Sequence, residues 1–256
     1  MKAKNLALII LIAIPLLLLA VGIYVTINLN SLVTKGVQSV GSDITQTSVT
    51  LQKSDISVLS GEGTLNQLSI GNPKGFSDNK AIELDSIKVA LDTESLASDT
   101  VIIKDLVIDK PAIRYEVSKT SSNLRQLLDN VKGSGAATGS GKQQTTTGKK
   151  LIINRLVISN GHVSIIAPPM DKPLSATLPT LTLKDIGRNE GGITPDKAFQ
   201  LVLSELTTAT SAAAAPSLDK LREQMGVKLE GETKGIVNTI KDKAGELGDK
   251  VKGLFK

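Results

Sequence analysis

Cysteine is absent from this chain of 256 residues, and histidine occurs once, at His162. These absences exclude disulfide bonds, thiolate metal ligands, cysteine nucleophiles and any cluster of several histidine ligands. Aromatic residues make up only 2% of the chain and tryptophan is missing, so recognition of a ligand by aromatic stacking is not expected. We accordingly expect no bound metal and no cofactor.

The residues that remain form no recognisable catalytic set. Gly141-Lys142 lies in a glycine-rich tract, but Ala136 stands where a phosphate-binding loop needs glycine and Gln143 where it needs serine or threonine. His162 falls in a predicted turn without a carboxylate or cysteine partner. Four carboxylates alternate with apolar residues and are best explained as the wet face of a sheet: Glu83, Asp85, Asp105 and Asp109. The sequence therefore predicts a protein that is not an enzyme.

The formal net charge is +5, but the excess lies at the two ends of the chain. Lys2 and Lys4 are at the start, and residues 216–256 hold nine basic against seven acidic residues. Between these ends, 19 basic side chains balance 18 acidic ones. A balanced body with hardly any aromatic residues is not typical of a nucleic-acid-binding surface, so no nucleic-acid partner is expected.

Asn5–Ile27 is an uncharged, mostly apolar run, longer than the roughly 20 residues that a helix needs to cross a bilayer. A cleavable signal peptide is the alternative, but its apolar region would be shorter and end in a small-x-small site, whereas Gly22-Ile23-Tyr24-Val25 continues apolar. Two lysines precede the run and residues 28–34 carry no charge, so the positive-inside rule keeps the N-terminus in the cytoplasm. We expect residues 1–28 to be a single-pass anchor in a bacterial inner membrane, with the bulk of the chain in the periplasm.

Hydrophobic periodicity predicts a short helix followed by strands. After the anchor, six apolar residues recur at spacings of three and four, as on one face of a helix: Leu29, Leu32, Val33, Val37, Val40 and Ile44. From Val49 to Leu91 the period changes to two, with turns at residues 60–63 and 71–75 and a bulge expected at Ser86. This regular short spacing favours an antiparallel meander over βαβ crossovers.

The clearest internal feature is a repeat. Residues 101–113 (VIIKDLVIDKPAI) recur fifty positions later as residues 151–163 (LIINRLVISNGHV), with five identical positions and the turn in register. A fainter copy lies at residues 65–73, and residues 181–186 resemble a fragment of another. Any two hydrophobic hairpins look somewhat alike, but the matched Pro/Gly turn favours an open sheet extended by similar strand units.

Helical patterns and a polar tract complete the chain. Ser122–Val131 has a cap residue followed by apolar residues at helical spacing, and residues 133–150 form a Gly/Ser/Thr-rich tract that we expect to be a flexible insertion. A helix is predicted from Pro195 to about Ala214, ending before Pro216. The glycine-rich tail beyond it is a conditional amphipathic helix, which either docks on a lipid surface or partner groove or stays solvated.

Together these patterns predict an α+β, mainly β, fold in three parts. Residues 1–28 are the membrane anchor, and residues 29–192 form a curved antiparallel β-sheet domain with short helices and the insertion at 133–150. Residues 193–256 form a helical, partly flexible C-terminal region. Each strand has one dry and one wet face, because apolar and polar residues alternate along it.

The order of features from Met1 to Val131 resembles the N-terminal region of the AsmA-like proteins of Gram-negative envelopes. Its most specific parts are L-x-I-x-N-P-x-G-F at Leu68–Phe76 and I-D-x-P-x-I-x-Y-E at Ile108–Glu116, followed by SSNLRQLLDNV. The resemblance implies a relation to bridge-like lipid-transfer proteins, whose repeated strands curl into a groove with an apolar floor, and a link to phospholipid traffic and outer-membrane integrity. It carries over no catalytic residue.

The leading hypothesis is therefore a non-catalytic, membrane-anchored periplasmic protein whose short apolar groove binds or helps move phospholipid and supports envelope lipid homeostasis. The alternative is an envelope scaffold or adaptor that contacts a partner protein through a sheet edge or the C-terminal helix. Alternation alone does not distinguish a lipid-facing floor from a core covered by helices. The groove implied by the resemblance would be lined by the inward-facing apolar set: Ile82, Leu84, Val89, Leu91, Ile103, Leu106, Ile108, Ile113, Leu156, Ile158, Val163 and Ile165.

Overall fold

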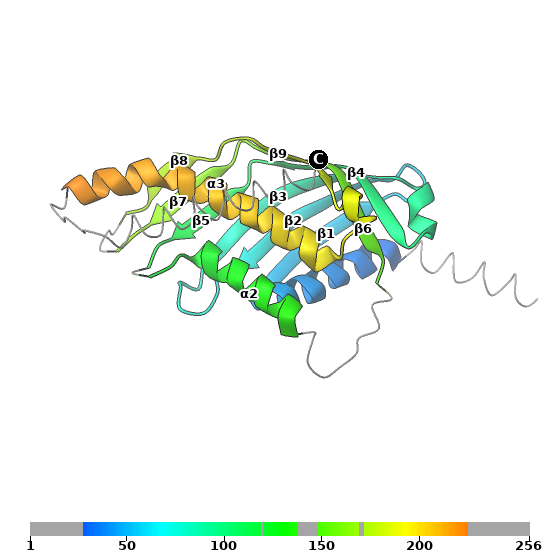
Figure 1. Ribbon diagram of the computed structural model, residues 1–256, viewed down its shortest axis with the longest axis horizontal. Coiled ribbons are helices and arrows are strands. Elements are labelled where there is room, and N and C mark those ends of the chain that lie inside the picture. Colours follow the sequence, from blue (N-terminus) through cyan, green and yellow to red (C-terminus); the bar gives the residue numbers. More distant parts are fainter. Residues whose placement is uncertain (1–27, 119, 138–147, 169–171, 225–256) are drawn as a thin grey trace, which may run out of the picture.

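The computed structural model describes residues 28–118, 120–137, 148–168 and 172–224. The expected membrane anchor, Asn5–Ile27, and the tail from Met225 onward lie outside these residues, as does the middle of the expected insertion. No helix within the described ranges is long and apolar enough to cross a membrane. The fold is mainly β, and its sheet curls around helices (Figure 1).

Nine strands of the described chain form one sheet. The first described element is a helix over residues 28–45, as the apolar spacing predicts. The helices that follow are α2 (Asn123–Ala137) and α3 (Pro195–Gln224), with the short 3-10 helices η1 (Glu94–Ala97) and η2 (Arg188–Glu190). The strands are β1 (Val49–Ile56), β2 (Glu62–Gly71), β3 (Lys80–Leu91), β4 (Thr100–Asp109), β5 (Ala112–Glu116), β6 (Lys150–Ser159), β7 (His162–Ile166), β8 (Leu174–Thr177) and β9 (Leu181–Ile186).

Several of these strands join end to end into longer, bent strands. β3 has 12 residues, enough to pair with both β4 and β5 along one edge. β4 and β5 therefore act as one strand bent at Lys110, and β6 and β7 as another bent at Asn160. Both bend residues have a left-handed backbone, with φ of 53° and 56°. β9 and β8 complete the series by pairing with β6 and β7.

The two copies of the sequence repeat lie side by side and parallel. β4 pairs with β6 and β5 with β7, and each residue faces the one fifty positions later, such as Leu106 opposite Leu156. The expected antiparallel meander is therefore wrong for these strands, although β1 to β4 are antiparallel. The reason is the crossover that includes α2, which returns the chain to the end of the sheet where β4 began.

The bulge expected at Ser86 is wrong. Ser86 pairs with Asn66, and the register continues unchanged on both sides of this pair. On β2, Gln67 adopts a φ of 52°, and the register of β2 and β3 shifts between Ile70 and Gly71. The shift leaves Ala81 of β3 as the extra residue, because Ile70 pairs with Ile82 and Gly71 pairs with Lys80, so the bulge lies on the expected strand but five residues before Ser86.

α2 and α3 bury much of one face of the sheet. α3 packs against β6, β7 and β8, and α2 packs against β5 and α3. Burying one large aliphatic side chain stabilises a fold by about 1.5–3 kcal/mol, so this layer supplies much of the stability. The helical residues that are buried in this core are Leu124, Leu127, Leu128 and Val131 on α2, and Ala198, Leu203, Leu206 and Ala214 on α3.

Both helices extend further than the sequence predicts. α2 continues to Ala137, into the tract that we expected to be a flexible insertion, and α3 passes through Pro216 to Gln224. Proline removes a backbone donor from a helix interior, at a cost of about 3 kcal/mol. Ala214 is fully buried and Leu218 packs against the core on either side of this proline, so tertiary contacts offset that cost.

The helix over residues 28–45 covers the edge of β1 with polar side chains. Asn30 accepts the N–H of Ile56 at 2.9 Å, and the Gln38 amide donates to the Leu51 carbonyl at 2.8 Å. Ser42 accepts a further β1 backbone N–H at 3.0 Å. These bonds satisfy backbone groups that a neighbouring strand would otherwise pair, so this edge is closed to strand addition. The polar residues recur at every fourth position: Asn30, Thr34, Gln38 and Ser42.

Two residues of the apolar face predicted for this helix, Leu32 and Val40, are exposed instead. The unpaired backbone groups of the β1 edge require polar partners, so the helix turns a polar stripe toward the sheet edge. That orientation leaves part of the apolar face in solvent. The helical spacing was predicted correctly, but the face that packs was predicted only in part.

Candidate functional site

The register of the sheet gathers the predicted groove residues onto one face. Ile82 on β3 pairs with Ile113 on β5, which pairs with Val163 on β7. Nearer the start of the helix over residues 28–45, Val89 on β3 pairs with Leu106 on β4. Strands far apart in the sequence therefore contribute to one continuous apolar surface.

Most of this surface is a closed core. Eight of the twelve predicted residues expose no more than 8% of their surface and belong to the cluster that α2 and α3 cover. A ligand would reach them only if a helix moved. The eight residues are Ile82, Leu84, Ile108, Ile113, Leu156, Ile158, Val163 and Ile165.

The other four predicted residues are partly exposed. Val89 pairs with Leu106, and Leu91 pairs with Ile103, on the neighbouring strands β3 and β4. Leu65 on β2 is also half-buried and lies beside them; the prediction from sequence omitted it, although it shows the same alternation. We call Leu65, Val89, Leu91, Ile103 and Leu106 the apolar strip.

The apolar strip lies at the end of the sheet where the helix over residues 28–45 begins. Gly63 on β2 pairs with both Ile56 on β1 and Val89 on β3. Ile56 in turn donates its N–H to Asn30, near the start of that helix. In Figure 1 the strands at this end are visible between the helix over residues 28–45 and α3. The strip is thus the part of the apolar face that the helices leave partly uncovered.

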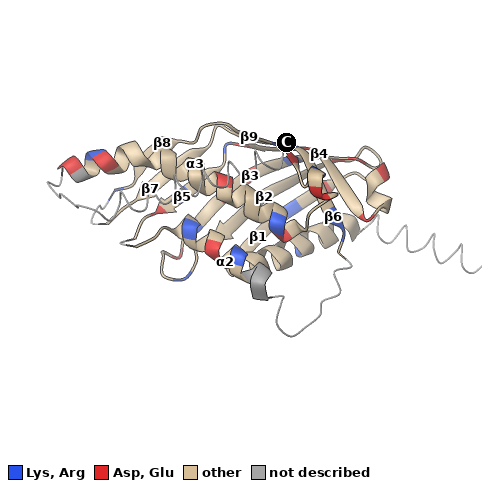
Figure 2. Cartoon of the chain, in the orientation of Figure 1, with Lys and Arg blue, Asp and Glu red and all other residues tan. Residues whose placement is uncertain are grey.

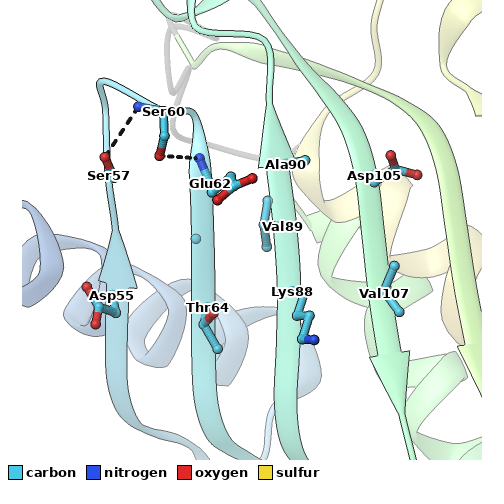
Figure 3. A pocket seen from close by; sticks show the side chains of 11 residues that line it. Asp55, Ser57, Ser60, Glu62, Thr64, Lys88, Val89, Ala90, Asp105 and Val107 are labelled. Atoms are coloured by element: carbon cyan, nitrogen blue, oxygen red, sulfur yellow. Dashed lines mark hydrogen bonds between the residues drawn. The ribbon is translucent and has the colours of Figure 1, made fainter.

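Two shallow hollows lie on the opposite, polar face of the sheet. One, of about 450 Å³, lies beside the β1–β2 turn and is lined by Asp55, Lys88 and Asp105 among others (Figure 3). Asp105 is held by Arg155 of the neighbouring repeat copy, with 2.5 Å between Nε and Oδ1. The second, of about 560 Å³, is lined by residues that include Glu83. These side chains form the wet face that the alternation predicts.

The remaining residues that were considered for catalysis or metal binding lie on the surface. His162 is exposed, but it is the first residue of β7 and pairs with Ala112 on β5, so it lies at the start of a strand rather than in the predicted turn. The hydrogen bond from Asn160, at 2.7 Å, is the main cause that lowers the pKa of Asp109. The described residues contain no group of three or more His, Cys, Asp or Glu that could hold a metal ion. Figure 2 shows basic and acidic residues dispersed over the visible face rather than gathered by sign.

A buried polar cluster joins the two motif segments of the sequence. Glu116, at the end of β5, accepts hydrogen bonds from Asn72 Nδ2 at 2.9 Å, from Arg114 Nε at 2.9 Å and from the Ser77 N–H at 3.0 Å. The Ser77 hydroxyl also donates to this carboxylate. Asn123, fully buried at the start of α2, accepts the Glu116 N–H at 3.0 Å and donates to Asn72 Oδ1 at 2.7 Å. The cluster fastens the β2–β3 loop and α2 to β5.

The Glu116 carboxylate is held in its charged form. Burial alone would raise its pKa, but the hydrogen bonds from Ser77, Arg114 and Asn72 act in the opposite direction and lower the pKa overall. Because hydrogen bonds occupy both of its oxygens, this carboxylate serves to hold the segments of the cluster together. Sequence reasoning did not single out the cluster, although Asn72 and Glu116 are the polar positions of the two motif segments.

Comparison with known families agrees with this arrangement. The sequence model of the AsmA family matches residues 1–176, more than half of the chain. No curated protein matches the chain. The matched range includes the motif segments, the polar cluster, both repeat copies and the apolar strip, and a curled sheet of this family is compatible with a lipid-holding groove. The extent of the match shows that the chain belongs to the AsmA family.

Proposed function

We propose that this protein holds phospholipid acyl chains on the apolar strip, next to the bacterial inner membrane that anchors it, and acts without catalysis. The observation that carries the proposal is the partial exposure of the strip within an otherwise closed apolar face. Membership of the AsmA family and the curl of the sheet support the same function.

The physical argument rests on exposed apolar area. Apolar surface in contact with water costs about 25 cal/mol per Å², and an acyl chain gains about 0.8 kcal/mol for each methylene group that it buries. Adjacent strands are about 4.8 Å apart, so the floor from β2 to β4 is roughly 10 Å wide. A slender apolar ligand fits such a floor better than a folded partner does.

The proposed location rests on the sequence. Asn5–Ile27 is uncharged and long enough to span a bilayer, and Lys2 and Lys4 precede it. The described residues begin at residue 28, directly after this run, and Asn30 lies beside the end of the sheet that carries the apolar strip. A lipid would therefore move only a short distance between the bilayer and the strip.

The test is site-specific photo-crosslinking of the full chain in its native membrane. A photoreactive amino acid replaces Val89 in the apolar strip, and the same amino acid replaces Val107 in the control. Val107 is on β4, directly after Leu106 of the strip, and pairs with exposed Lys88 on the outer face, whereas Val89 packs against the core although it also borders the outer hollow. Mass spectrometry of the purified adducts identifies the crosslinked molecule.

We expect phospholipid adducts at position 89 that exceed those at position 107 several-fold. Leu106→Asp should reduce the adduct at position 89, because a charge on the floor makes burial of an acyl chain unfavourable. Equal lipid adducts at positions 89 and 107 in a folded protein would contradict the proposal.

Under the adaptor hypothesis, one edge of the sheet remains available for contact with a partner protein. The edge of β1 is covered by the helix over residues 28–45, whereas β8 and β9 pair only with β7 and β6 within the described chain. Exposed Thr182 on β9 is the matching crosslinker position at this edge. Protein adducts at Thr182 together with no lipid adduct at Val89 would favour the adaptor.

A further inference from the structure

The turn between β1 and β2 carries two adjacent apolar side chains in solvent. Leu59 is 98% exposed and Val58 43% exposed. Exposed aliphatic side chains forgo the stabilisation that burial provides, and these two are consecutive at the tip of a hairpin. We call Val58 and Leu59 the hairpin tip.

The turn that presents the hairpin tip is rigidly built. The Gly61 N–H donates to the Ser57 carbonyl at 2.9 Å, and the Gly61 carbonyl accepts the Leu91 N–H at 2.6 Å. The hydroxyls of Ser57 and Ser60 accept further backbone N–H groups of the turn at 3.3 Å (Figure 3). The exposed tip is therefore presented by a turn that several hydrogen bonds hold at Ser57, Ser60, Gly61 and Glu62.

The hairpin tip points toward the end of the apolar segment. Asn30 contacts Ile56 and Gln38 contacts Leu51, so β1 runs antiparallel to the helix over residues 28–45 and toward its start. Leu59 is at most about 10 Å beyond Ile56. With about 6 Å between the Cα atoms of Asn30 and Ile56, the tip lies within roughly 17 Å of Asn30, three residues after the apolar run ends in the sequence.

We infer that the hairpin tip inserts into the outer leaflet of the membrane in which Asn5–Ile27 is anchored, so that the mouth of the apolar strip faces the lipid. This inference rests on the proposed anchoring and lipid holding. The strip begins close to the tip, because Gly63 pairs with Ile56 on one side and with Val89 on the other.

Burial of the tip in the bilayer is an apolar interaction rather than a charge attraction. Lys53 is paired with Asp55 at 3.7 Å, and Lys88, which lines the hollow beside the turn, shares that hollow with the carboxylates of Asp55, Glu62 and Asp105. A surface without excess positive charge gains nothing from anionic headgroups. Insertion should therefore be equal in neutral and in anionic bilayers.

Tryptophan fluorescence tests the inference, because the chain contains no tryptophan of its own. The full chain carrying Leu59→Trp is placed in nanodiscs of phosphatidylcholine, with and without brominated phosphatidylcholine as the quencher. Lys74→Trp is the control: Lys74 is exposed in the β2–β3 loop, at the opposite end of the same strands. A second set of nanodiscs contains phosphatidylglycerol, and alkaline extraction of native membranes tests the anchor.

We expect several-fold quenching of Trp at position 59, little quenching at position 74, and the same result with phosphatidylglycerol. No quenching at position 59 in a chain that resists alkaline extraction would overturn the insertion and leave the anchor in place. A chain that alkali extracts would overturn the anchoring and this inference with it. Quenching that requires phosphatidylglycerol would overturn the apolar mechanism.

Discussion

Asn72 and Glu116, 44 residues apart in the sequence, are joined by a hydrogen bond of 2.9 Å between Nδ2 and Oε1. The bond connects the loop after β2 to the end of β5, and Asn123 adds the start of α2 to the same cluster. The polar residues of the two motif segments therefore fasten the helical layer to the sheet. This attachment keeps α2 over the core, while the apolar strip is the part of the face that stays partly exposed.

Glu116→Gln should destabilise the fold by about 1.5–3 kcal/mol at pH 7, because it replaces charge-assisted hydrogen bonds with weaker ones. The pKa of Glu116 is lowered in the folded protein, so its contribution is fully present above the unfolded pKa of about 4.3 and is lost as pH falls through the folded pKa. Urea unfolding of the full chain in mild detergent, followed by circular dichroism at pH 7 and at lower pH, measures both effects. Exposed Glu83→Gln is the control and should leave stability unchanged. An equal loss for both variants would contradict the role of the cluster.

Leu156→Ala should cost more stability than Leu106→Ala, although the two leucines occupy the same position of the repeat and pair with each other. Leu156 is fully buried beneath α3, and removing it leaves a cavity, which costs about 2–5 kcal/mol. Leu106 is only half-buried, so its loss leaves a smaller cavity. Urea unfolding of both variants gives the difference. Equal costs would mean that the strip is as closed as the core.

Thr210→Val should leave stability unchanged or raise it by up to about 1 kcal/mol. Among the described residues, the fully buried Thr210 hydroxyl has no hydrogen-bond partner, and a buried unpaired hydroxyl is destabilising. Thr207→Val is the matched control on the same helix, because the Thr207 hydroxyl donates to the Leu203 carbonyl at 2.7 Å. Thermal unfolding should show a higher midpoint for the first variant than for the second. The reverse order would show that the Thr210 hydroxyl contributes to stability.

Gly61→Ala should destabilise the β1–β2 turn by about 2 kcal/mol or more. Gly61 has a φ of 72°, and a Cβ there would lie 2.7 Å from the Leu91 carbonyl oxygen, so the variant adds a steric overlap to backbone strain. Gly75→Ala separates the two causes, because Gly75 has a φ of 94° but a Cβ there would meet nothing within 4 Å. Urea unfolding should show the greater loss for Gly61→Ala. A similar loss at both positions would mean that strain alone decides the effect.

The local elements follow from the sequence. Period-two alternation places Val89 and Leu106 on one face, and the cap residues before α2 and α3 mark where each helix begins. The repeat predicts similar strand units with the turn in register, and the structure places residues of left-handed backbone at the matching positions Lys110 and Asn160. These features depend on neighbouring residues along the chain, so a linear pattern contains them.

The arrangement of these elements in space was decided by contacts between distant segments. Alternation is the same in parallel and antiparallel pairs, so the sequence did not show that β4 and β6 are parallel. A helix pattern ends at Pro216, but the packing of Ala214 and Leu218 carries α3 through it. Leu106 and Leu156 are identical in type and repeat position, but Leu106 on β4 is partly exposed, whereas Leu156 is fully buried on β6, against which α3 packs. The sequence by itself thus determined which residues share the apolar face. The tertiary structure decided which of these residues are buried, because the helices that bury them are remote in the chain.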